Sequence, residues 1–200
     1  MSTGVAAQSK FGEVVEASVV RLVGQCHRLY DAPPLGALVR AGDAVFAVVD
    51  GVATAALDPG RQIIARGADA DSEEDVYARH PQLERLLRTQ VTLTVVGCRD
   101  GERLLQHLPP LPPRIHTFLH RCSGDETRAF MQHADFLALL LQSALPEADE
   151  IVAAALRQAA PAFDRPREFL IDASRSIAAQ LPANAARLSA IMRRLPLDGS

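Results

Sequence analysis

The chain has 200 residues, of which 48% are hydrophobic and 22% charged, so it can bury a substantial core and lacks the composition of a disordered protein. Its formal net charge of −3 provides no general attraction to nucleic acid or to an acidic membrane surface. Three scattered cysteines exclude a disulfide framework, and no apolar run is long enough to span a bilayer. We therefore expect a cytoplasmic protein.

Up to about Ser123 the sequence predicts short strands, because apolar residues alternate or form short valine-rich runs broken by Gly, Pro and Asp. Gly42-Asp43 and Asp100-Gly101 each predict a hairpin turn between two such runs. Gly51 interrupts an otherwise continuous strand, which indicates a bulge that bends the strand around a corner. The expected strands are 12–16, 19–26, 36–41, 44–49 with its continuation to 57, 91–98, 103–108 and 115–122.

A helical insertion is expected between two of these strands, at about residues 72–89. Ser72 and Asp75 have the spacing of a helix start, in which the serine oxygen accepts a hydrogen bond from an unpaired backbone N–H. Pro81 fits the first turn of a second short helix over residues 82–88.

Beyond Ser123 the sequence becomes rich in Ala and Leu, and prolines cut it into segments of helical length. Ser123 and Glu126 have the spacing of a capping box. The expected helices run from there to Pro146, over 147–159, over 165–180 with Asp164 as its cap, and over about 182–195. The fold class is therefore α+β. We expect a small closed β-barrel over residues 10–122, and a helical bundle or arm over residues 123–196.

Three stretches of the first half resemble the HAS barrel: FGEVVEASVVRLVGQC, APPLGALV and AVFAVVDGVAT, within residues 11–54. This module is a small N-terminal β-barrel of HerA-type DNA translocases and of the catalytic subunits of rotary ATP synthases, where it helps to form the ring. The whole chain is also similar to short bacterial proteins that carry this barrel and a helical tail, with LPPLPPRIH before the last strand. The resemblance covers roughly residues 10–122. It implies a barrel that docks onto other barrels or onto a ring ATPase.

The sequence departs from the motor proteins in one decisive respect. A P-loop needs a lysine that reaches the β- and γ-phosphates within a frame of glycines, and Lys10, the only lysine, has no such frame. We therefore expect no ATPase activity. We also find no pair of acid and base and no nucleophile constellation, so the chain is not expected to be an enzyme or to need a cofactor.

Three residues near the end of the first half form a candidate metal site. His116, His120 and Cys122 alternate along the last expected strand, so all three side chains could face the same side. One interpretation is a partial metal site, with a fourth ligand from Cys26, Cys98 or His107. The other, which the sequence favours, is that these side chains fill a barrel face and its rim.

Two segments are candidates for binding a partner. The run of prolines over residues 108–113 favours a rigid polyproline II turn, which is either a docking segment or a stiff connection between strands. In the tail, a helical stripe presents an apolar face. The candidate partner-binding residues are Pro109, Pro110, Pro112, Pro113, Arg114, Leu188, Ile191 and Met192.

Two classes of function remain. The first is a non-catalytic interaction and assembly module, which associates with itself or with a HerA-type ring ATPase in DNA processing; this step rests on resemblance of fold. The alternative is a β-barrel that binds a small ligand or nucleic acid. Direct binding of nucleic acid is not expected, because the sequence has no arginine stripe and few aromatic residues on which bases could stack.

Overall fold

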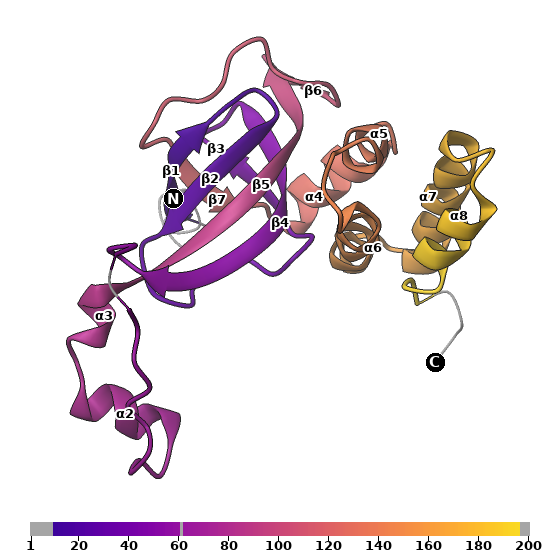
Figure 1. The fold of residues 1–200 in the computed structure, drawn as a ribbon. Coiled ribbons are helices and arrows are strands. Elements are labelled where there is room, and N and C mark those ends of the chain that lie inside the picture. The colour runs from indigo at the N-terminus through magenta and orange to yellow at the C-terminus, as the bar shows by residue number, and fades with distance from the viewer. Residues whose placement is uncertain (1–9, 61, 197–200) are drawn as a thin grey trace.

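The computed structural model describes residues 10–60 and 62–196 of the chain. These residues form an α+β structure, in which an antiparallel seven-stranded sheet is followed by helices (Figure 1). The strands are β1 (Lys10–Ala17), β2 (Arg21–Cys26), β3 (Leu38–Ala41), β4 (Val45–Ala56), β5 (Leu87–Asp100), β6 (Arg103–Leu105) and β7 (Phe118–Arg121).

The hydrogen bonds of the sheet close on themselves. Its strand order is β2-β1-β7-β3-β4-β5-β6, and β2 also pairs with β5, so six strands form a ring and β6 is attached to β5. One apolar cluster packs within the sheet and includes Phe11, Leu22, Val39, Leu93 and Leu119, all of which are buried.

The local turn signals of the sheet are confirmed. β3 and β4 form a hairpin, although Ala41 pairs with Val45, so the turn has three residues instead of two. Asp100 pairs with Arg103 in the β5–β6 hairpin. The register of β4 shifts between Val49 and Gly51, as expected of a bulge.

The last strand is shorter than the sequence pattern predicts. β7 begins only at Phe118, because residues 114–117 form a turn in which the N–H of Thr117 donates to the carbonyl of Arg114. His116 has a φ of 67° in this turn, in the left-handed region that strands do not use. Residues 115–117 therefore lie before β7, and the alternating pattern of residues 115–122 does not correspond to one continuous strand.

The insertion between β4 and β5 is helical, as expected. Its helices are α2 (Glu73–Arg79) and α3 (Leu83–Leu86), and the side chain of Ser72 accepts a hydrogen bond from the N–H of Asp75 at 3.2 Å. The second helix is shorter than expected, because Leu87 and Arg88 already belong to β5 and pair with β4.

The helices after the sheet are α4 (Gly124–Met131), α5 (Phe136–Leu141), α6 (Ala148–Ala159), the 3₁₀ helix η1 (Ala160–Ala162), α7 (Pro166–Gln180) and α8 (Ala185–Met192). The capping box at Ser123 and Glu126 is confirmed. The single helix expected up to Pro146 is instead two helices, α4 and α5. Asp164 does not cap α7; it forms an ion pair with Arg128, and Arg165 occupies the cap position. None of the described helices is long and apolar enough to cross a membrane.

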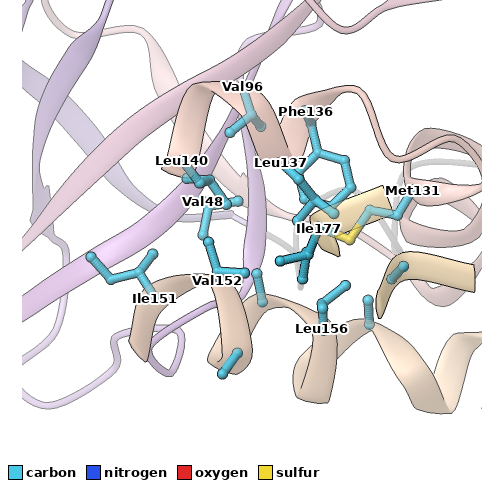
Figure 2. Packing of buried hydrophobic residues seen from close by; sticks show 14 of the residues in the cluster. Val48, Val96, Met131, Phe136, Leu137, Leu140, Ile151, Val152, Leu156 and Ile177 are labelled. Carbon is cyan, nitrogen blue, oxygen red and sulfur yellow. The ribbon is translucent and has the colours of Figure 1, made fainter. Parts of the chain in front are cut away.

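The helices pack against the sheet through a second apolar cluster. Phe46, Val48 and Val96 contribute to it from the sheet, while neighbouring residues of the same strands point into the first cluster. Figure 2 shows Val48 and Val96 beside side chains of α5 and α6, with Ile177 of α7 reaching the same cluster. Because β4 and β5 are buried on both faces, their sequences read as valine-rich runs rather than strict alternation.

A close backbone contact also joins the two parts. Gly36 has a φ of 83°, and a Cβ atom at this position would lie 2.3 Å from the carbonyl carbon of Ala154 in α6. Only glycine therefore fits where the chain leads into β3.

Candidate functional site

The structure separates the three residues of the candidate metal site. His116 lies in the turn before β7 and its Nδ1 contacts the carboxylate of Glu13 at 2.9 Å. Cys122 is instead packed against the cluster between sheet and helices, where burial raises the pKa of its thiol to about 12. Burial also lowers the pKa of His120. Among the described residues, no group of three His, Cys, Asp or Glu side chains could hold a metal ion.

Glu13 instead joins two histidines at the surface. Its Oε1 lies 3.1 Å from Nε2 of His27, and its Oε2 lies 2.9 Å from Nδ1 of His116. Hydrogen bonds from both imidazoles hold the pKa of Glu13 below its usual value. The cluster connects β1, the end of β2 and the turn before β7. The contact between Glu13 and His27 could have been inferred from the pairing of β1 with β2, which brings the two residues close together. No local sequence pattern indicates the contact with His116.

Phe118 lies beside this cluster and is 46% exposed. The Nζ atom of Lys10 is 4.3 Å from the centroid of its ring, and the ring of His27 meets it edge-on at 6.3 Å. The only lysine of the chain is therefore held over an exposed aromatic ring.

The proline segment is largely at the surface. Figure 1 shows the connection from β6 to β7 passing over one end of the sheet. Pro110, Pro112 and Arg114 are exposed, whereas Pro109 is buried and Pro113 is partly buried. Leu111, which the sequence analysis did not single out, is 75% exposed, and Ile115 is 49% exposed. An apolar, conformationally restricted segment thus faces solvent.

The apolar side chains of the tail stripe pack mainly inside their own chain. Ile191 is 0% exposed and belongs to the cluster between sheet and helices. Leu188 and Met192 are partly buried and pack against the same cluster. The apolar face was predicted correctly, but it contacts α6 and α7 of its own chain, and its burial leaves little for a partner to contact.

A buried carboxylate stands out among the residues that the sequence analysis missed. The side chain of Asp50 is 1% exposed, accepts a hydrogen bond from Thr94 Oγ1 at 2.6 Å and pairs with Nη2 of Arg21 at 3.2 Å. Arg21 and Thr94 also line a cavity of about 450 Å³ between the sheet and the end of α5, together with Val20, Val95, Leu108, Leu139, Gln142, Ser143, Ala144 and Leu145. An aspartate within the apolar run VVDGV is the sequence signal by which Asp50 could have been noticed.

No family model matches the chain, and no curated protein matches it.

Proposed function

We propose that the chain is a non-catalytic interaction and assembly module, and that it is a partner of a HerA-type ring ATPase in DNA processing. The closed ring of strands around an apolar interior supports the finer inference that the sheet is a small closed β-barrel, with the later helices as a bundle beside it. The resemblance of residues 11–54 to the HAS barrel supports the kind of partner.

The observation that carries this proposal is the exposed apolar surface of residues 110–118. Leu111, Ile115 and Phe118 present large apolar side chains to water within one short stretch. The prolines around Leu111 restrict the backbone, so little conformational entropy is lost when a partner covers it. Exposed apolar side chains on a restricted backbone are typical of docking segments.

A catalytic role finds less support. The thiols that could act as nucleophiles are poorly ionised, because burial raises the pKa of Cys26 to about 11 and that of Cys122 to about 12. The chain also lacks the lysine and glycines of a phosphate-binding loop.

The test is binding of the full chain to a purified HerA-type ring ATPase from the same organism, measured by sedimentation velocity. We expect a complex with the wild-type chain, and at least about tenfold weaker binding for Leu111→Asp, because a charge replaces an apolar contact at the proposed centre of the interface. Leu111→Met is the matched control, since it keeps the apolar surface, and it should bind like the wild type. Absence of a complex with the wild-type chain would contradict the proposed partnership.

The cavity beside Arg21 favours a second candidate, the binding of a small amphipathic ligand. Its walls are mainly apolar, and the ion pair with Asp50 holds the Arg21 guanidinium at one side, where a carboxylate or carbonyl oxygen could accept a hydrogen bond. Octanoate is a suitable probe. A rise in melting temperature with octanoate, lost in Arg21→Ala and absent with octane-1-sulfonamide as a neutral control, would support this candidate over the first.

A further inference from the structure

We call residues 57–86 the arm, and its described residues, 57–60 and 62–86, project from the sheet on the side away from α7 and α8 (Figure 1). None of the described residues of the arm is buried. Its helices have only seven and four residues, and helices of this length are marginal in water without packing. The arm therefore has no core of its own.

The arm nevertheless has defined local contacts. Arg79 pairs with Asp75 at 2.6 Å and donates to the carbonyl of Asp69 at 2.8 Å, which ties α2 to the preceding loop. The hydroxyl of Tyr77 is hydrogen-bonded to that of Tyr30, and their rings meet edge-on at 6.3 Å. These contacts fix the position of α2 without covering it.

Exposed large hydrophobic side chains are concentrated at the arm. Of nine large hydrophobic side chains that are exposed in the described part of the chain, five belong to the arm or to the end of the sheet that carries it. Ile63 and Ile64 are 56% and 66% exposed. The five are Tyr30, Val52, Leu57, Ile63 and Ile64. A surface of this kind is typical of an interaction site.

The net charge of the arm indicates which kind of surface would bind to it. The arm contains seven acidic residues and four arginines, a net charge of −3 that equals the net charge of the whole chain. The rest of the chain therefore has equal numbers of acidic and basic side chains. Within that rest, residues 160–196 contain six arginines and three acidic residues, a net charge of +3. Four of these arginines form ion pairs: Arg165 and Arg175 with Glu168 and Asp172 of the same segment, and Arg187 and Arg194 with Asp149 and Glu150 of α6. Arg167 and Arg193 are exposed, and neither forms an ion pair with another described residue.

We propose that the arm of one molecule docks onto the arginine-rich α7–α8 surface, residues 160–196, of a second copy of this chain. The two surfaces lie at opposite ends of the molecule, so they cannot meet within one chain (Figure 1). A contact between different surfaces of identical chains is heterologous, and it produces either a closed ring or a growing chain of molecules. This association goes beyond the proposed partnership with a ring ATPase and does not depend on it.

Sedimentation velocity of the full chain tests this association. The wild type should associate with rising protein concentration at about 0.1 M NaCl and dissociate at about 1 M NaCl, where the screening length falls from about 10 Å to about 3 Å. The arm variant Glu73→Arg/Glu74→Arg and the tail variant Arg167→Glu/Arg175→Glu should each associate at least about tenfold more weakly, because like charges then face one another. Far-UV circular dichroism checks that both variants keep their helices.

A mixture of the two variants provides the sharpest result. The tail variant keeps an intact arm and the arm variant keeps an intact tail, and the two reversed surfaces again carry opposite charges, so an equimolar mixture should associate more strongly than either variant alone. Glu16→Arg/Glu102→Arg changes the net charge as much as the arm variant does, at exposed positions outside the arm, and should associate like the wild type. A monomeric wild type at low salt would overturn the inference, as would an arm variant that associates like the wild type, whether or not the chain binds a ring ATPase.

Discussion

Phe46 of β4 and Phe130 of α4 stack with their ring centroids 4.9 Å apart, and both side chains are almost completely buried. This pair joins the sheet to the helices. Phe130→Ala should reduce the free energy of unfolding by about 3–5 kcal/mol, because it removes a large apolar side chain and leaves a cavity. Urea denaturation followed by circular dichroism measures this loss.

Phe118→Ala is the matched control, since the same atoms are removed from a ring that is 46% exposed. The loss there should be about 1 kcal/mol or less, mainly from the contact with Lys10. Equal losses in the two variants would mean that the Phe46–Phe130 contact does not hold sheet and helices together.

Ile191 provides a test of whether the tail belongs to the core. Ile191→Asp should reduce the free energy of unfolding by about 3–5 kcal/mol, because a charge without a partner would be buried between α8 and its neighbours. The change should also lower the helical signal in circular dichroism. Ile64→Asp, at a side chain that is 66% exposed, should change the stability by about 0.5 kcal/mol or less. A stable, fully helical Ile191→Asp variant would instead return this residue to the candidates for a partner surface.

The three cysteines should be slow to react in the folded protein. Cys26, Cys98 and Cys122 are free thiols, and burial raises the pKa of each. Because the thiolate is the nucleophile, a thiol reagent such as dithionitrobenzoate at pH 8 should label few sites in the native chain and all three after unfolding in guanidinium. Rapid labelling of Cys122 without denaturant would show that the packing between β7 and the helices opens readily.

The features that the sequence predicted correctly depend on residues that are close along the chain. The bulge at Gly51, the cap at Ser72 and the capping box at Ser123 each involve residues within four positions, so their chemistry can be read locally. The same dependence on local patterns explains why the strand over residues 115–122 was predicted too long. The alternating pattern continues into the turn before β7, and nothing in the sequence indicates the positive φ of His116.

The sites depend on the order of strands, which local patterns do not determine. Arg21, Asp50 and Thr94 come from β2, β4 and β5 and meet only because these strands are neighbours in the sheet. The stripe at Leu188 and Ile191 shows a related limit. Helical periodicity identifies an apolar face, but it does not distinguish a face that meets the core of its own chain from one that meets a partner.

The cluster around Glu13 predicts how stability depends on pH. Hydrogen bonds from His116 and His27 hold the pKa of Glu13 below its ordinary value of 4.5. A carboxyl whose pKa is lowered by folding stabilises the folded state above its unfolded pKa, and this contribution is lost as the pH falls through the lowered value. The wild type should therefore melt at a higher temperature than Glu13→Gln at about pH 5, and the difference should shrink towards about pH 3.

Thermal denaturation across this pH range measures the difference, and two controls separate the cluster from general acid effects. Glu16→Gln removes an exposed carboxylate from the same strand and should show a smaller difference at every pH. His116→Gln should reproduce part of the effect of Glu13→Gln, because it removes the partner on Oε2 and leaves His27 on Oε1. A difference between the wild type and Glu13→Gln that stayed constant down to the acid limit would contradict the lowered pKa, since a protonated carboxyl accepts hydrogen bonds from the two imidazoles less strongly than a carboxylate does.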